Sequence, residues 1–508
     1  MFYCELGKDR NRNRTANLNR IGQQIYTDFT DWSEALKLFL WINLRKSAKS
    51  ADIFRMTTPT DAQRMEKIVS LCKRRGFIFQ SSEIYGGLNG LWDYGPLGVE
   101  LKRNLKNYWW RVMVHERDDV VGMDGSILMN RAVWKASGHE DTFSDPMVDC
   151  RVCKARLRAD QMIEKKGVRQ CPNCGSKDLT ESRPFNLMFK TYVGATEDES
   201  SITYLRPETA QSIFVQFKNV LEVSRKKLPF GIAQIGKAFR NEINPRNFTF
   251  RSREFEQMEL EYFCRAEEGM RLLEYWKEQR LKFYENIGIP RDTLHVKTVS
   301  DEERAFYSTG TYDIEYDFPF GRQELEGVAY RTDYDLSQHQ KTSGKSLEYF
   351  DEETKQRFIP HVVEPSAGVD RTVLALICEA YSEDEAPDEK GKMETRLVLR
   401  FHPRIAPIKC AVFPLLKNKE QLVAKAKEIV DLLRPHMNVF YDESGAIGRR
   451  YRRQDEIGTP FGVTIDFETL GEKDASLRDT VTLRDRDSMK QERVAIQDLA
   501  AILRARIA

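Results

Sequence analysis

Two alternating runs of residues, joined by a loop that contains a proline, constrain the fold of this chain more than any other feature. The runs are residues 231–242, GIAQIGKAFRNE, and residues 253–259, REFEQME. Their period of two predicts the paired strands of a hairpin. One face of that hairpin carries Gln234, Ala238, Arg240, Phe255, Gln257 and Glu259. The other face carries Ile235, Phe239, Met258, Leu260 and Tyr262.

The two faces of this hairpin differ in chemistry. The apolar face suits a core, whereas the other face presents a cation, an aromatic ring and carboxylates in one direction. Arg240 can hold a phosphate through two hydrogen bonds, Phe255 can stack on a base, and Glu242 can accept a hydrogen bond from an exocyclic amine. The hairpin therefore indicates a nucleotide site. The alternative is a half-solvated hairpin with ordinary surface charges.

Length and composition set the broad class. A chain of 508 residues is too long for one core and should form two or three domains. Its 80 basic and 78 acidic residues nearly cancel, and a 41% share of hydrophobic residues is ordinary for a soluble globular protein. The overall charge balance does not indicate whether the chain binds nucleic acid, so local clusters of charge must decide that question. Five cysteines are scattered, which favours a reducing compartment and hence the cytoplasm: Cys4, Cys72, Cys264, Cys378 and Cys410.

Residues 1–55 differ from the rest of the chain. Residues 10–20 are rich in arginine and asparagine, and the apolar run around residues 35–44 is too short to span a bilayer. The stretch holds more acidic residues than a transit peptide usually has, so we expect a disordered extension without function. Met56 is a sensible start, because Thr60 and Asp61 can cap a helix that Gly76 ends. One face of that helix carries Met65, Ile68, Val69 and Cys72.

Two pairs of cysteines have the spacing of a metal site. Cys150 and Cys153 form one CxxC pair, and Cys171 and Cys174 form the other. Four thiolates can saturate a tetrahedral zinc ion and leave no open position, so the spacing predicts a structural zinc site. Four unligated cysteines are the alternative.

The C-terminal part reads as a separate small α/β unit. A stretch rich in proline and charge, residues 382–394, marks the edge of the first domain, and residues 403–407 form the linker. Strands are predicted at 411–416, 439–442, 461–466 and 480–486, and helices at 421–433, 446–457 and 492–507. Four arginines crowd one helical stretch, as expected for contact with RNA phosphates or for a solvated run of charge: Arg449, Arg450, Arg452 and Arg453.

The order of several motifs resembles one enzyme family. FRNE, a loop and RxFEQME resemble motif 2 of the class II aminoacyl-tRNA synthetases, and residues 364–371, EPSAGVDR, resemble motif 3. Residues 205–211, LRPETAQ, lie upstream, with 324–327, ELEG, and 331–336, RTDYDL, downstream. Together they are similar to the glycyl-tRNA synthetases of the single-chain, homodimeric type. The likeness runs from about Glu66 to the C-terminus.

The resemblance implies an α+β fold. It places a class II catalytic domain, built on an antiparallel sheet, at 56–402, with a zinc-ribbon-like insertion at about 145–182. An anticodon-binding α/β domain follows at 403–508. Residues 94–98, YGPLG, open a helix at 99–114 in the position of motif 1, which lies at the dimer interface in this family. Burial of that helix and its Trp109 and Trp110 in the monomer core is the alternative.

The resemblance also implies a reaction. Glycine and ATP form glycyl-adenylate and pyrophosphate, and the glycyl group then passes to the terminal ribose of its tRNA. Arg240 would hold the α-phosphate and Arg371 the γ-phosphate as the catalytic pair, while Phe255 stacks on adenine with Arg371 on the other side. Magnesium would bind Glu324 and Glu326. The full ATP set is Arg240, Asn241, Glu242, Phe250, Arg251, Phe255, Glu324, Leu325, Gly368 and Arg371.

Glycine offers only an ammonium and a carboxylate, so its pocket needs anionic groups and no room beyond Cα. The resemblance implies the set Arg158, Glu208, Gln257, Glu259, Arg331, Glu364 and Ser366. A synthetase for another small or polar amino acid is one alternative, which the glutamates and Ser366 argue against. A catalytically dead RNA-binding relative is the other, but its ATP arginines would be expected to be lost. The histidines, His139 included, suggest no Ser/His catalysis, and no segment reads as an editing domain or a membrane span.

Overall fold

The computed structural model describes residues 59–165, 167–305, 307–387 and 391–508. The predictions for residues 1–55 and for a start at Met56 lie outside these residues. The first described element is α3 (Pro59–Arg75), which confirms the predicted helix before Gly76, with Ile68 and Cys72 fully buried. None of the helices in the described part combines the length and the apolarity that a bilayer crossing requires.

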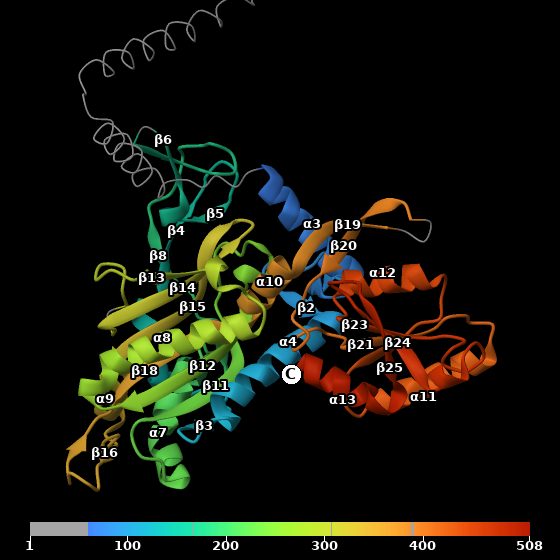
Figure 1. Ribbon diagram of the computed structural model, residues 1–508. Coiled ribbons are helices and arrows are strands. Elements are labelled where there is room, and N and C mark those ends of the chain that lie inside the picture. The colour runs from blue at the N-terminus through green and yellow to red at the C-terminus, as the bar shows by residue number, and fades with distance from the viewer. Residues whose placement is uncertain (1–58, 166, 306, 388–390) are drawn as a thin grey trace, which may run out of the picture. The chain divides into compact units, whose positions relative to one another are not determined.

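The predicted hairpin is part of a seven-stranded sheet, next to its edge strand β3 (Figure 1). The strand order is β13-β14-β15-β18-β12-β11-β3, and every pairing is antiparallel except that of β11 with β3. The strands are β3 (Val120–Gly122), β11 (Phe230–Phe239), β12 (Glu254–Cys264), β13 (Leu294–Thr298), β14 (Gly310–Phe318), β15 (Gly321–Thr332) and β18 (His361–Gly368). The register pairs Ala238 with Phe255 and Gln234 with Glu259, so the predicted polar face is confirmed.

Helices cover both faces of this sheet. Met258, Leu260 and Tyr262 of β12 belong to the larger core, as the alternation predicts, together with α4 (Pro96–Trp110), α8 (Gly269–Asn286) and α10 (Val369–Ala380). On the other face, Phe263 packs with α7 (Ala210–Ser224) and α9 (Tyr334–Ser343) in a smaller core. Phe263 lies on the same face as Phe255, Gln257 and Glu259. That face is therefore apolar at one end and polar at the other.

The segment with the two CxxC pairs forms a small β-rich insertion. It contains β4 (Ser144–Asp149), β5 (Arg156–Arg158), β6 (Ile163–Lys165), β7 (Val168–Gln170) and β8 (Arg183–Asn186). Strands β5, β4 and β8 form one sheet, and β6 and β7 form a hairpin. The remaining short elements of this half are β1 (Ile78–Gln80), β2 (Trp92–Tyr94), α5 (Arg131–Ala136), α6 (His139–Thr142), β9 (Lys190–Tyr192), β10 (Ile202–Tyr204), β16 (Tyr349–Phe350) and β17 (Arg357–Phe358).

The C-terminal unit is a five-stranded mixed sheet in the order β22-β21-β23-β24-β25. Its elements are β21 (Cys410–Pro414), α11 (Glu420–Leu433), β22 (Val439–Tyr441), α12 (Ile447–Ile457), β23 (Phe461–Ile465), β24 (Thr480–Asp485), β25 (Gln491–Ala495) and α13 (Ile496–Ile507). The helix predicted at 492–507 begins only at Ile496, because residues 491–495 pair with β24 as an edge strand. The other predicted elements of this unit are present, with small changes at their ends.

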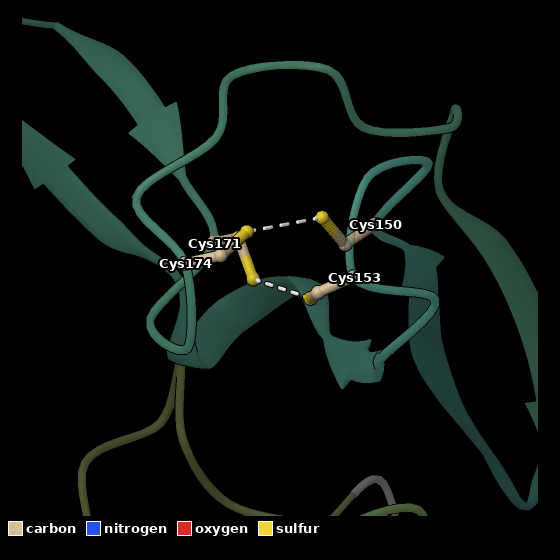
Figure 2. A group of neighbouring side chains, drawn as sticks. All are labelled: Cys150, Cys153, Cys171 and Cys174. Carbon is tan, nitrogen blue, oxygen red and sulfur yellow. Dashed lines mark hydrogen bonds between the residues drawn. The ribbon is translucent and has the colours of Figure 1, made fainter.

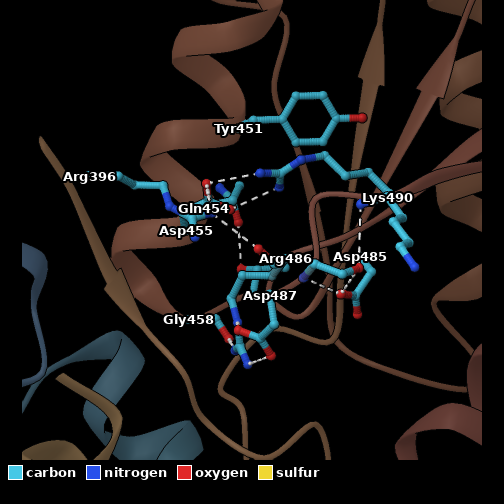
Figure 3. A network of polar contacts seen from close by, with 12 residues as sticks. Arg396, Tyr451, Gln454, Asp455, Gly458, Asp485, Arg486, Asp487 and Lys490 are labelled. Atoms are coloured by element: carbon cyan, nitrogen blue, oxygen red, sulfur yellow. Dashed lines mark hydrogen bonds and ion pairs between the residues drawn. The ribbon is translucent and has the colours of Figure 1, made fainter. Parts of the chain in front are cut away.

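The edge of the first domain is a hairpin rather than an irregular stretch. Strands β19 (Tyr381–Pro387) and β20 (Met393–Leu399) pair across the region predicted as a charged boundary. Arg396 of β20 is almost fully buried and donates to Asp384, to Asp455 of α12 at 3.3 Å and to the carbonyl of Arg486 at 3.1 Å. Figure 3 shows Arg396, Asp455 and Arg486 at this junction. Asp384, one charge of this stretch, is therefore used in an ion pair with the buried Arg396.

Candidate active site

A cavity of about 360 Å³ lies over the polar face of β11 and β12 and beside β15 and β18. The structure brings most of the predicted site residues together around it. Those of the predicted ATP set that line it are Arg240, Glu242, Phe250, Arg251, Phe255, Glu324, Leu325, Gly368 and Arg371. Those of the predicted glycine set are Glu208, Gln257, Glu259, Arg331, Glu364 and Ser366. The volume is within the range of small-molecule sites.

Arg240 follows directly after β11 and is held between two aromatic rings. Its guanidinium lies 5.3 Å from the ring centroids of both Phe143 and Phe255, and its Nε donates to the carbonyl of Pro207 at 3.0 Å. In the neighbouring loop, Arg251 pairs with Glu242 at 3.2 Å. Stacked and hydrogen-bonded guanidinium groups have few rotamers, so this end of the cavity presents fixed positive charge.

Arg371 lies in the first turn of α10, whose inward face is buried. Its Nε donates to the carbonyl of Phe250 at 3.3 Å, its Nη1 donates to the carbonyl of Glu324 at 3.2 Å, and the guanidinium is 4.5 Å from the ring centroid of Phe250. The carboxylate of Glu324 is 3.5 Å away. Arg371 thus stacks on Phe250. Its place opposite Phe255 across an adenine stays a prediction.

Carboxylates gather at another part of the lining. Glu259 is buried and accepts hydrogen bonds from the hydroxyls of Ser366, at 2.8 Å, and Thr209. Glu208 lies 3.4 Å from His139 and accepts from Gln211 at 3.0 Å. Burial disfavours the charge on Glu208, but His139 and the other donors nearby outweigh the effect of burial. They hold the pKa of Glu208 well below its usual range. Burial and the neighbouring Glu208 raise the pKa of Glu259.

Arg331 is the cation of this region, yet its donors are used within the protein. It is 2% exposed, donates to Asp335 at 2.8 and 2.9 Å and to Glu364 at 2.9 and 3.0 Å, and lies 4.0 Å from the ring centroid of Tyr307. A bidentate pair on each side fixes the guanidinium. Arg331 therefore holds Glu364 in place.

Three predicted residues lie elsewhere. Asn241 is not among the lining residues, and Arg158 is outside the lining as well, paired with Asp145 at 2.5 Å and Asp160 at 2.8 Å. The prediction that Glu326 binds magnesium is wrong. Its carboxylate is 1% exposed and accepts from Arg280 of α8 at 2.6 Å, inside the core on the other side of the sheet. A register shift between β14 and β15 breaks the alternation, so Glu324 and Glu326 do not share a face.

Sequence reasoning missed several residues around this cavity. Tyr307 and Thr311 line it, and His139 and Asp335 contact lining residues. Asp335 stands inside the quoted RTDYDL stretch, but its role depends on its ion pair with Arg331 of β15, which a motif does not show. Glu261 continues the row of Phe255, Gln257 and Glu259 by one step of period two, and that signal could have found it.

The four predicted cysteine ligands converge in the insertion (Figure 2). The Sγ atoms of Cys150 and Cys174 are 3.6 Å apart, as are those of Cys153 and Cys171. All four lie within 4.8 Å of one another. Four thiolates around a zinc ion, each about 2.3 Å from it, are about 3.8 Å apart, so the spacing fits a zinc tetrahedron and is far too long for disulfide bonds.

The arginines of α12 have mostly internal partners. Arg450 is 2% exposed and donates to the carbonyls of Gly445 and Pro414. Arg453 pairs with Asp442 at 2.5 Å, and Arg452 donates to the carbonyl of Ala386 at 3.3 Å. Arg449 is exposed. Burial argues against a phosphate contact by Arg450 and leaves Arg449 as the most accessible of the four.

Comparison with known proteins agrees with this geometry. Residues 189–381 match the tRNA synthetase class II core domain (G, H, P, S and T), and residues 409–506 match an anticodon binding domain. Over 463 residues, 88% of this chain and 99% of the relative, the chain is 53% identical to the glycine–tRNA ligase of Thermobifida fusca. It is 51% identical over 464 residues to that of Clostridium perfringens, covering 86% of this chain and 97% of the relative.

The chain belongs to the glycine–tRNA ligase family. A third glycine–tRNA ligase, from Treponema denticola, is 52% identical over 445 residues, 87% of this chain and 97% of the relative. The class II core match includes the hairpin and both Arg240 and Arg371. In this glycine–tRNA ligase family member, the cavity is therefore part of an aminoacyl-tRNA ligase, and the separate C-terminal sheet is its anticodon-binding domain.

Proposed function

We propose that this member of the glycine–tRNA ligase family activates glycine with ATP in the cavity and transfers the glycyl group to its tRNA. One observation carries the assignment of residues: the lining joins arginines held by aromatic rings to a pair of neighbouring carboxylates, Glu208 and Glu259, in one cavity. The arginines suit phosphates, and the carboxylates suit an ammonium group.

The first step brings two anions together, because a glycine carboxylate attacks the α-phosphate. The residues must neutralise charge and align the reacting groups, and no residue needs to take a proton from the nucleophile. Arg240 is assigned to the α-phosphate and Arg371 to the γ-phosphate. Phe255, the ring beside Arg240, is assigned to adenine.

Magnesium fits the ATP end of the cavity. Glu324 lines the cavity with its carboxylate half exposed, and carboxylate oxygens are ligands that magnesium prefers. The ion would neutralise phosphate charge when bound with ATP. Glu326 has no part in this assignment, since Arg280 holds it in the core.

The ammonium of glycine is assigned to Glu208 and Glu259, with Ser366 beside them. Ser366 and Thr209 fix both oxygens of Glu259. A pocket that only fails to contact an added methylene discriminates by about 1–3 kcal/mol, so selection against alanine needs a wall that clashes with the extra methyl group.

The zinc site, the dimer and the cytoplasmic location belong to the same proposal. Cys150, Cys153, Cys171 and Cys174 would hold a structural zinc ion, supported by the spacing of their sulfurs. Helix α4 would lie at the interface of a homodimer of the single-chain type. Trp109 of α4 is buried within the chain at 1% exposure, so any contact with a second subunit falls to other residues of the helix, such as Val99 at 39%.

The test is amino-acid-dependent exchange of pyrophosphate into ATP, with glycine, alanine, serine, proline and threonine offered separately. Exchange with glycine alone is expected. Exchange with another amino acid would still support a class II synthetase but would overturn the pocket assignment. No exchange would favour a catalytically inactive relative or a site that needs tRNA for activation.

A matched pair of variants tests the pocket itself. Glu259→Gln should raise the KM for glycine strongly and leave the KM for ATP nearly unchanged. Glu254→Gln is the control, because Glu254 is on the same strand but outside this cavity, partly exposed and paired with Lys237. Equal effects of the two variants would count against the glycine pocket.

A further inference from the structure

The glycine end of the cavity rests on a buried carboxyl group that the reaction does not explain. Glu261 of β12 is 0% exposed and does not line the cavity. Neither of its carboxyl oxygens has a hydrogen-bond partner. A buried carboxylate without a partner is among the most costly groups in a protein interior, so this residue requires a physical account.

The sheet register places a second carboxyl group directly opposite. Glu259 pairs with Ser366 and Tyr262 with Val363, so Glu261 of β12 and Glu364 of β18 stand opposite each other on the same face. One carboxyl oxygen from each of Glu259, Glu261 and Glu364 lies within 4.8 Å of the other two. Like charges at opposite positions of neighbouring strands repel, so the pair is unstable with both members ionised.

The neighbours decide which member holds a proton. Burial raises the pKa of Glu364, but the two hydrogen bonds that it accepts from Arg331 favour its ionised form, whereas Glu261 accepts none. Burial first, and then the charges of Glu364, Glu259 and Asp335, raise the pKa of Glu261 far above its usual value, with only Arg331 opposing them. The proton therefore resides on Glu261 at neutral pH.

We infer that Glu261 is a positioning residue of the glycine pocket, an uncharged carboxylic acid whose single O–H group donates a hydrogen bond to one of the two carboxylates beside it, Glu259 or Glu364. This inference rests on the proposed assignment of Glu259 to the ammonium of glycine. One oxygen of each of these two residues lies within 4.8 Å of an oxygen of Glu261, and the inference requires a rotation of the Glu261 side chain that brings its O–H group into hydrogen-bond distance. A hydrogen bond from this O–H group favours the ionised form of the carboxylate that accepts it, and a neutral Glu261 adds no negative charge beside the other.

The consequence for glycine binding follows from charge. Glu259 must be ionised to hold the ammonium, but burial and Glu208 raise its pKa. A neutral donor counteracts that shift without adding a further negative charge to a region that already contains Glu208, Glu364 and Asp335. Glu261 thus supports the ammonium site although it does not contact the substrate.

The experiment compares Glu261→Gln with Glu261→Leu in the full-length enzyme. Gln keeps the size, the neutrality and a donor, and Leu removes the donor. Glu261→Gln should retain the KM for glycine. Glu261→Leu should raise it by roughly tenfold or more, as expected for loss of a hydrogen bond to a charged group, with the KM for ATP unchanged. The acid limb of kcat/KM for glycine should move to higher pH in the Leu variant only.

Several outcomes would overturn the inference. One is a Gln variant as impaired as the Leu variant, and another is a Leu variant with normal kinetics. If the Leu variant does not fold, the Gln variant decides the matter alone, because a charged Glu261 would make the amide a poor substitute. Infrared spectroscopy of the unaltered enzyme should show the carbonyl band of an un-ionised carboxylic acid at neutral pH, and that band should be missing in Glu261→Gln.

The infrared result separates this inference from the pocket assignment. If Glu259→Gln leaves glycine kinetics unchanged but the band is present and assigned to Glu261, the pocket is wrong and only the protonation holds. If Glu259→Gln impairs glycine use but the band is absent, the pocket holds and Glu261 is ionised, which overturns the inference.

Discussion

Replacing Arg371 by alanine should lower the rate of glycyl-adenylate formation by a factor of about 10² to 10³, the usual effect of losing one donor that stabilises charge in a transition state. The structure shows why the residue suits that task. Two carbonyls and the ring of Phe250 hold the guanidinium at the cavity, and its side chain keeps 25% exposure. The factor corresponds to about 2.7–4 kcal/mol.

The upper end of that range is expected because of Glu324. Its carboxylate lies 3.5 Å from Arg371, so the alanine variant leaves a negative charge unneutralised beside the phosphates. The rate of glycyl-adenylate formation by Arg371→Lys should lie between that of the unaltered enzyme and that of Arg371→Ala, since lysine keeps the charge but not the planar pair of donors.

The assay is exchange of pyrophosphate into ATP at saturating glycine, with kcat and the KM for ATP determined separately. Arg322→Ala is the control, because Arg322 is on the same sheet, 47% exposed, and paired with Asp317 outside the cavity. If Arg371→Ala kept exchange within about threefold of the unaltered enzyme, the motif 3 assignment would be refuted.

Three further predictions concern stability and metal. Cys174→Ser should lose a bound zinc ion in native mass spectrometry, whereas Cys72→Ser, in the core, should keep it. Asp455→Asn should lower the free energy of unfolding by about 3–5 kcal/mol, because it breaks a buried network, whereas Glu383→Gln, in an exposed pair, should cost less than about 1 kcal/mol; similar melting temperatures would contradict this. Burial and the nearby Glu324 raise the pKa of Asp313 to about 6. Its proton therefore favours the folded state at low pH, and this contribution is lost as pH rises from about 4 to 6. Asp313→Asn should thus stabilise the protein at pH 8 more than at pH 4 in thermal melts, and a pH-independent effect would refute the shift.

Much of the site could be predicted because a strand has a fixed period. Alternation placed Phe255, Gln257 and Glu259 on one face before any contact was known, and the register with β11 agrees. The same rule failed for Glu326, since a register shift beside it reversed the direction of its side chain. The prediction at the short edge strand β25 was also wrong, because a local pattern does not show which strand will provide a partner. Residues 491–495 resemble the start of a helix until β24 provides a partner.

The sequence by itself determined the chemistry of this protein: which groups carry charge, which stack, and which lie on one face of a hairpin or helix. These properties belong to residue types and local periods. Only the tertiary structure decided which charged groups have partners. It paired Arg331 with Glu364 and buried Arg450 against carbonyls, and it left the carboxyl group of Glu261 without a hydrogen-bond partner. Such pairings join residues far apart in the chain, and their energies depend on burial, which no local pattern specifies.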